Sequence, residues 1–243
     1  MNEQTANPSN EPPRLAEPRT DSGDHVVKAV VFDLGETLVD ETGAWGDWAD
    51  WLHVPRLTLF GALGGVIARG GHHHDVFPLV RPGFDYEAEK RARDAAGRRP
   101  GVLMEDFYPD ALEALRRLAA KGLAIGIAGN QPAATEAVLH ELGLPLAIAA
   151  SSERWGINKP DPAFFARIID ELGLPAREIA YVGDRIDNDV RPAAAAGMFA
   201  VFIRRGPWAF VQSGGNDPAE ASATIDSLSE LEGILVGRGR PDP

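Results

Sequence analysis

The sequence contains no cysteine among its 243 residues. A disulfide-stapled fold and thiolate metal ligands are therefore excluded. The sequence also lacks any run of about 18 consecutive apolar residues, the length that a membrane-spanning helix needs. Its first residues have neither the basic start nor the apolar stretch of a signal peptide. These absences predict a soluble, cytoplasmic protein that does not engage a membrane.

Basic residues are scarce relative to acidic ones, with 24 Lys and Arg against 36 Asp and Glu. The net charge of -12 repels phosphate backbones over most of the surface, which argues against a nucleic-acid partner. The 44% hydrophobic content is sufficient for an ordinary core, and the length suits one large domain or a core with an insertion. The sequence leaves the oligomeric state open.

The chain divides into four parts by composition. Residues 1–25 are rich in Asn, Pro, Glu and Ser, and we expect a disordered tail there, with a loose C-terminus at 238–243. Residues 26–42 and 107–237 alternate short apolar runs with amphipathic stretches, which predicts an α/β core. Residues 43–106 interrupt this alternation with helical patterns only, which predicts an inserted α-helical cap.

Five apolar runs in the core are predicted strands, and amphipathic stretches separate most of them. This order is typical of a Rossmann-like parallel sheet flanked by helices. We expect the first strand to lie in its centre. The predicted strands are HVVKAVVF, LAIGIAGN, LAIAAS, EIAYVGD and FAVFIRRG.

Polar residues follow three of these strands directly. Asp33 ends the first, Gly129 and Asn130 end the second, and Asp184 ends the fourth. Because ligands of open α/β sheets bind beyond the carboxyl ends of the strands, these residues are candidates for one site. Two further candidates lie in helix-opening segments. They are Lys159 in INKPDPAFF and Asp189 in GDRIDNDV.

Together these motifs resemble those of the haloacid dehalogenase (HAD) superfamily of hydrolases. Its members carry an aspartate after the first strand, a lysine before a proline, and Gly-Asp with a second acid a few residues later. The resemblance covers residues 26–236, and NKPDPAFF and VGDRIDNDVRPAAAAGM carry most of it. A cap after the first motif fits one branch of the superfamily.

The resemblance implies a role for each matching residue. Asp33 would be the nucleophile that forms an aspartyl-phosphate, and Lys159 would neutralise Asp33 and the phosphoryl group. The substrate would be a small phosphorylated metabolite. Thr37, Gly129 and Asn130 would contact its phosphate. Mg²⁺ would be held by Asp33, the Gly35 carbonyl, Asp184 and Asp189, with Asp187 as the fallback for Asp189.

Two positions depart from the phosphatases of this superfamily. Gly35 stands where they carry an aspartate that protonates the leaving group, and Gly129 stands where a hydroxyl would contact the phosphate. Glu36 is a candidate replacement acid, but only if the loop is distorted, since adjacent residues in an extended segment point to opposite sides. Substrates with good leaving groups would need little acid. The alternatives are a phosphate-binding protein without effective turnover, or a carbon-centred hydrolase of the dehalogenase or phosphonatase type.

The predicted cap contains two conspicuous patterns. Trp45, Trp48 and Trp51 recur at helical spacing, which favours packing over a substrate pocket. The run His72–His74 is expected in an exposed loop rather than in a metal site. Beyond the cap, Arg204 and Arg205 follow the fifth predicted strand and could meet an anion or lie on the surface.

Overall fold

The computed structural model describes residues 26–99 and 101–236. The predicted tail at 1–25 and the predicted loose end at 238–243 therefore both lie outside the described part. Within it, six parallel strands form one sheet in the order β3-β2-β1-β4-β5-β6. Strand β1 lies between β2 and β4, so its predicted central position is confirmed. The strands are β1 Ala29–Phe32, β2 Ala124–Gly129, β3 Leu146–Ser151, β4 Ile179–Gly183, β5 Phe199–Ile203 and β6 Ala223–Ile225.

Helices cover both faces of this sheet, as predicted for a Rossmann-like fold. They bury β1 completely, and its side chains alternate between two apolar cores. Val30 and Phe32 face the core shared with α5 and α11, while Ala29 and Val31 face the core shared with α8 and α9. These helices are α5 Ala111–Ala120, α6 Thr135–His140, α7 Ser152–Trp155, α8 Pro162–Leu172, α9 Arg191–Ala195, α10 Gly206–Ser213 and α11 Leu231–Leu235.

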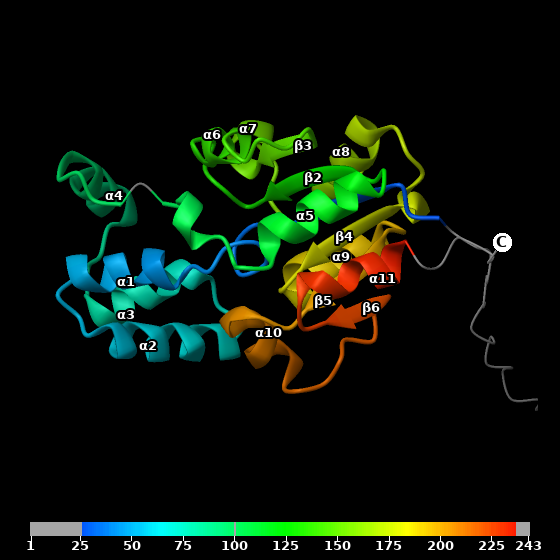
Figure 1. The fold of residues 1–243 in the computed structure, drawn as a ribbon. Helices are drawn as coiled ribbons and strands as arrows, with labels where there is room; N and C mark the ends of the chain where they lie inside the picture. Colours follow the sequence, from blue (N-terminus) through cyan, green and yellow to red (C-terminus); the bar gives the residue numbers. More distant parts are fainter. Residues whose placement is uncertain (1–25, 100, 237–243) are drawn as a thin grey trace, which may run out of the picture.

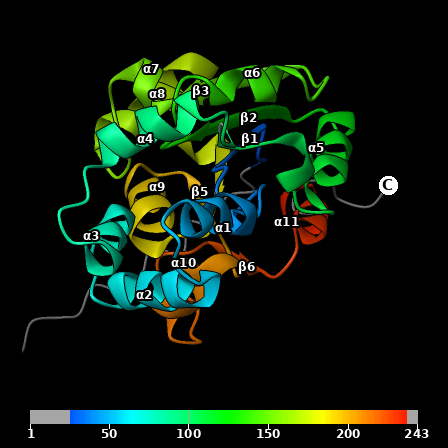
Figure 2. The same cartoon turned by 90° about the vertical axis from the view of Figure 1, so that its left-hand side faces the viewer.

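Four helices between β1 and α5 lie beyond one end of the sheet (Figures 1 and 2). Their shared core contains Trp48, Leu59 and Phe77, and Trp208 of α10 packs into it. The packing predicted for Trp48 is thus present. The division into a cap and a core remains a prediction, although this separate apolar cluster fits it. The helices are α1 Thr42–Trp51, α2 Arg56–Ala68, α3 Val76–Val80 and α4 Tyr86–Ala95.

The predicted number of strands was wrong by one. Strand β6 has only three residues, with Ile203 of β5 beside Ile225, and is too short to show a periodic pattern. The stretch SLSELEGILVG predicts a last helix that starts earlier than the observed one, because α11 begins only at Leu231. Helix α10 was not predicted either.

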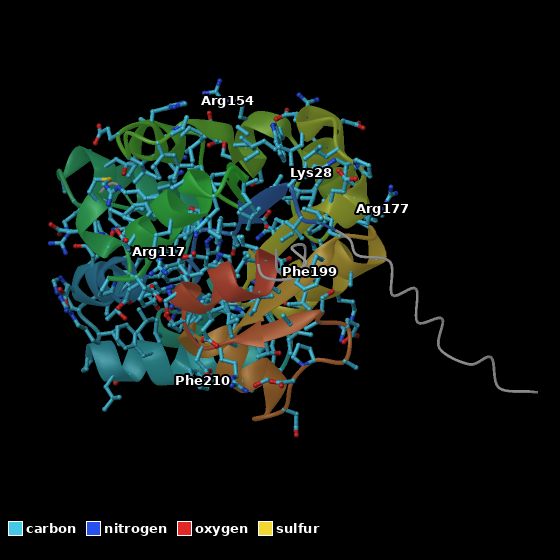
Figure 3. The ribbon with its side chains drawn as sticks, turned by 45° about the vertical axis from the view of Figure 1, so that its right-hand side comes forward. Lys28, Arg117, Arg154, Arg177, Phe199 and Phe210 are labelled. Atoms are coloured by element: carbon cyan, nitrogen blue, oxygen red, sulfur yellow. The ribbon has the colours of Figure 1, made fainter. Side chains whose placement is uncertain are left out.

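Ion pairs between helices stabilise the outer surface of the core only modestly. Arg117 extends from α5 (Figure 3), and its Nη2 lies 2.7 Å from Oε2 of Glu232 on α11. Exposed pairs of this kind contribute little to stability. In the described part of the chain, no single helix is long and apolar enough to cross a membrane; α1 and α2 pass that test only as a pair bent by 114°.

Candidate active site

The predicted site residues meet at the carboxyl edge of the sheet. From β1 the chain runs outward to β2 and β3 on one side, and β4 returns to the other side of β1. Asp33 leaves β1 at this reversal, and its N–H donates to the Val182 carbonyl oxygen at 2.9 Å. Asp184 follows β4 directly. The carboxylates of both therefore lie at the position where open α/β sheets bind ligands.

Lys159 joins two carboxylates in the interior of the site. Its Nζ lies 2.7 Å from Oδ1 of Asp33 and 2.5 Å from Oδ1 of Asp189. All three side chains are buried. Burial alone would lower the pKa of Lys159, but the Asp189 and Asp33 carboxylates more than offset this and hold that pKa well above its usual range. The ammonium group is therefore charged and aimed at the oxygens of Asp33.

The backbone of Lys159 is fixed by the segment that follows β2. The Asn130 side chain accepts a hydrogen bond from the Lys159 N–H at 2.7 Å and donates one to the Lys159 carbonyl oxygen at 2.9 Å. The ring of Tyr181 on β4 lies beneath the ammonium, 5.6 Å from Nζ to its centroid. Both polar ends of the Asn130 amide thus position the lysine, and its expected contact with phosphate remains a prediction.

A π-helical turn, Ile186–Val190, brings Asp189 back over the end of β4. Oδ2 of Asp189 accepts a hydrogen bond from the Arg185 N–H at 3.0 Å, and any side chain at Gly183 would collide with this aspartate. Burial raises the pKa of Asp189 to about 6, although Lys159 opposes this shift. Asp187 is exposed and pairs with the Arg185 guanidinium instead, so it lies outside this buried cluster.

Asp184 has a fully buried carboxylate oxygen that its neighbours do not satisfy. In the described part of the chain, its buried Oδ2 has no hydrogen-bond partner. Burial, together with the nearby charges of Asp189 and Asp33, raises the pKa of Asp184 well above its usual range. One oxygen from each of these three carboxylates lies within 4.8 Å of the others. A hard divalent cation such as Mg²⁺ prefers oxygen ligands of this kind, so the donor set fits that ion.

The loop after β1 is distorted at Glu36, as a replacement acid there would require. Gly35 pairs with Val39 across a tight turn, and Glu36 adopts a left-handed backbone with φ 54°. Its carboxylate nevertheless has other partners, because Oε2 accepts from the Tyr108 hydroxyl at 2.7 Å. Oε1 accepts from the Glu41 N–H at 3.1 Å. Glu36 therefore connects the loop to its surroundings.

Glu41 is a site residue that sequence reasoning missed. It immediately precedes α1, and its Oε1 lies 2.5 Å from the point that a Cβ atom on Gly35 would occupy. Its Oε2 accepts a hydrogen bond from Nε1 of Trp45 at 3.3 Å. Burial and the charge of Glu36 raise the pKa of Glu41 to about 7. The signal available in the sequence was an acidic residue, Glu41, shortly after Gly35, the position where the acid of the related phosphatases is missing.

The two other predicted phosphate-contact positions have different surroundings. A Cβ atom on Gly129 would collide with Oδ1 of Asp33, so the missing hydroxyl is explained by the close approach of the Asp33 carboxylate. Thr37 is buried, and its Oγ1 has no hydrogen-bond partner among the described residues. Its carbonyl oxygen accepts from Nη1 of Arg205 at 3.1 Å, and Arg205 also pairs with Asp110. The Arg205 charge is therefore already matched.

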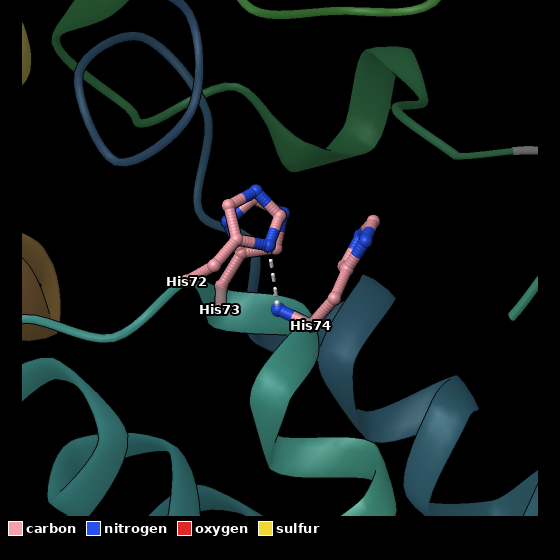
Figure 4. Close-up of side chains that lie close together, drawn as sticks. All are labelled: His72, His73 and His74. Carbon is pink, nitrogen blue, oxygen red and sulfur yellow. Dashed lines mark hydrogen bonds between the residues drawn. The ribbon is translucent and has the colours of Figure 1, made fainter.

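The side chains of the run His72–His74 lie close together (Figure 4), and two of them contact aromatic rings of the neighbouring helices. His72 is exposed, as expected, but His73 and His74 are partly buried. The His74 ring stacks on Tyr86 with centroids 3.9 Å apart, and His73 meets Trp45 edge-on at 6.0 Å. The His72 Nδ1 accepts the His74 N–H at 3.2 Å. One ring nitrogen from each of the three histidines lies within 4.8 Å of the others, so the expected absence of a metal site in this run stays a prediction.

Known proteins share both this sequence pattern and this fold. Glyceraldehyde 3-phosphate phosphatase of Methanocaldococcus jannaschii is 34% identical over 131 residues, which cover 53% of this chain. The matched part spans about half, 56%, of that archaeal protein's length. Phosphoglycolate phosphatase of Rhodospirillum rubrum is 33% identical over 195 residues, covering 74% of this chain and 80% of the relative.

Solved structures extend the likeness of the fold to nearly the whole described chain. The HAD phosphatase from Thermococcus onnurineus superposes with a TM-score of 0.56 and 24% identity, covering 88% of this chain and all of that one. The sequence profile of the haloacid dehalogenase-like hydrolases matches residues 27–197, which is most of the chain. With this match and the Rhodospirillum relative, the chain belongs to the haloacid dehalogenase-like hydrolase family.

Proposed function

We propose that this protein is a magnesium-dependent phosphatase that hydrolyses a small phosphorylated metabolite through an aspartyl-phosphate on Asp33. The observation that carries the proposal is the buried contact of Lys159 with Asp33 at 2.7 Å. A carboxylate with a fixed ammonium beside it can approach a phosphate dianion with less charge repulsion. The names of the relatives point to substrates with two or three carbons as the first to test.

The metal would be held by Asp33, Asp184 and the Gly35 carbonyl, with Asp189 beside them. The unpartnered Oδ2 of Asp184 supports this set, because a buried carboxylate oxygen without a donor is costly unless a ligand satisfies it. When bound, Mg²⁺ would supply positive charge to the phosphoryl oxygens. Asp189 also has a second function in this proposal, since it holds Lys159 in position.

The residues of the chain divide the reaction into two steps. Lys159 contacts Oδ1 of Asp33, so Oδ2 is the oxygen that attacks phosphorus while the bond to the leaving oxygen breaks. Water then attacks the same phosphorus, the bond to Asp33 breaks, and the free carboxylate returns with release of inorganic phosphate. Lys159 stays protonated in both steps, since its two carboxylate partners favour the charged form.

A second candidate function is phosphate binding without effective turnover. Gly35 supports it, because this residue supplies no acid to the leaving group. The two functions differ in whether any substrate is consumed. Binding alone would give retention of phosphate in a metal-dependent manner and no product.

Phosphate release from a panel of substrates tests the proposal directly. The panel should contain phosphoglycolate, glyceraldehyde 3-phosphate, an acyl phosphate and an aryl phosphate, each with Mg²⁺ and with a chelator. The variants are Asp33→Asn and, as a matched change of an exposed acid near the site, Asp187→Asn. We expect Mg²⁺-dependent release that Asp33→Asn abolishes and Asp187→Asn retains. Release that survives Asp33→Asn would refute the aspartyl-phosphate, and binding without release would support the second candidate.

A further inference from the structure

The space beside Gly35 is filled by a side chain from elsewhere in the loop. Because Gly35 pairs with Val39, the chain turns back and reaches α1 close to its own starting point. The Glu41 carboxylate then lies where a side chain at position 35 would begin, with Oε1 2.5 Å from that Cβ position. It is also close enough to Asp33 for the two carboxylates to interact electrostatically.

The Glu41 carboxylate is held in this position from the opposite side. Trp45, one helical turn further along α1, donates its indole N–H to Oε2 at 3.3 Å. The Trp45 ring is itself stacked on Phe77 of α3, with centroids 6.0 Å apart and an interplanar angle of 25°. The second oxygen of Glu41 is therefore anchored to the helices beyond the sheet, and Oε1 is the oxygen nearest to Gly35.

Glu36, the acid next to Gly35 in the sequence, has no carboxylate oxygen left without a hydrogen bond. Both oxygens of Glu36 accept hydrogen bonds, one from the Tyr108 hydroxyl and one from the Glu41 N–H. A Cβ atom on Gly206 would also collide with the Glu36 side chain, so the start of α10 packs closely against Glu36. Glu36 thus supports the loop and the backbone of Glu41.

We propose that Glu41 is the general acid and general base of this enzyme, in place of the side chain that Gly35 lacks. The proposal rests on the phosphatase function proposed above. In the first step, the bond from phosphorus to the leaving oxygen breaks, and the Glu41 carboxylic acid gives its proton to that oxygen. In the second step, the Glu41 carboxylate takes a proton from the attacking water as the bond from phosphorus to Asp33 breaks. One turnover therefore returns both carboxyl groups to their starting states.

Rapid-quench kinetics with Glu41→Gln separates the two steps. With an aryl phosphate, the first step needs little acid, whereas the second still needs a base. We expect a burst of about one phenol per enzyme and then turnover slowed by roughly 10²–10⁴-fold. With an alkyl phosphate, we expect the burst itself to be lost. Glu89→Gln is the matched control, because Glu89 likewise accepts an indole N–H, from Trp51 at 2.8 Å, but is not among the groups near Gly35.

Three results would overturn this role. Glu41→Gln that keeps the wild-type steady-state rate on an alkyl phosphate would refute it alone, provided that Asp33→Asn still abolishes release. A burst in Glu36→Gln instead would give the role to Glu36. A wild-type protein without any Asp33-dependent release would overturn the phosphatase function and this role together.

A relocated carboxylate provides an independent confirmation in case Glu41→Gln perturbs folding. Glu41→Ala removes the side chain next to Gly35, and Gly35→Asp in the same chain then has space for its own carboxylate. We expect this double variant to turn over alkyl phosphates at least about tenfold faster than Glu41→Ala alone. Equal rates in the two variants would contradict the proposal, provided that both have the melting temperature of the wild type.

Discussion

Lys159→Met should be one of the most destabilising single changes in this protein. The substitution keeps an unbranched side chain of similar length but leaves the buried carboxylates of Asp33 and Asp189 without their cation. Removing one partner from a buried ion pair typically costs about 3–5 kcal/mol of unfolding free energy. In a chain of this size, that loss corresponds to a melting temperature lower by roughly 6–20 °C.

Urea unfolding in the presence of a chelator is the assay, so that no bound cation can replace the ammonium. Lys121→Met is the matched control: Lys121 is half-exposed and pairs with Glu232 at 2.9 Å, so we expect a loss of at most about 1 kcal/mol. Protonation of Asp189, whose pKa burial already raises to about 6, limits the loss below neutral pH. Lys159→Met combined with Asp189→Asn should recover part of the stability. A loss in Lys159→Met as small as in the control would refute the reasoning.

Three further changes test other parts of the molecule. Asp184→Asn should weaken Mg²⁺ binding by about 10–100-fold in calorimetry, since it removes the unpartnered buried carboxylate, whereas Asp187→Asn should change it by less than about twofold; equal losses would contradict the assignment. His73→Gln should reduce the loss of stability in acid. Burial and neighbouring histidines lower the pKa of His73 from 6.5 to about 3. Between these two pH values the folded state binds fewer protons than the unfolded state, so the free energy of unfolding decreases as the pH is lowered. Urea titrations at pH 7 and 4.5 should show that the wild type loses about 1–2 kcal/mol more than the variant; equal losses would contradict this. Gly129→Ser should lower the free energy of unfolding by about 1–3 kcal/mol in thermal melts, because its Cβ would collide with Asp33, and an unchanged melting temperature would contradict this steric argument.

The sheet could be predicted from the sequence because its central strands are continuous buried runs. Strand β1 faces apolar cores on both sides, and such strands leave a strong local pattern. The same local patterns predicted that Asp33 and Asp184 lie at one edge. Strand β6 left no comparable pattern, since only its three residues pair with β5.

The details of the site depend on contacts that no local pattern records. The position of Glu41 depends on the pairing of Gly35 with Val39, and Glu36 was the nearer candidate by sequence. The resemblance implies that Asn130 contacts phosphate, but no local pattern indicated that its amide also holds the backbone of Lys159. In both cases the contacts of the side chain depend on how the backbone turns, which residue type and spacing do not determine.

The segment that begins at Glu41 continues into the four helices beyond the sheet, while Asp33 directly follows β1 and Lys159 lies in the turn before α8. The carboxylate beside Gly35 and the four helices beyond the sheet are thus encoded by one contiguous stretch of the gene. A recombination event or a laboratory graft that exchanged residues 41–99 would transfer both together. A recipient with its own aspartate at the position of Gly35 would then have two carboxylates in the same space. A donor that lost this segment would lose both the carboxylate and the four helices.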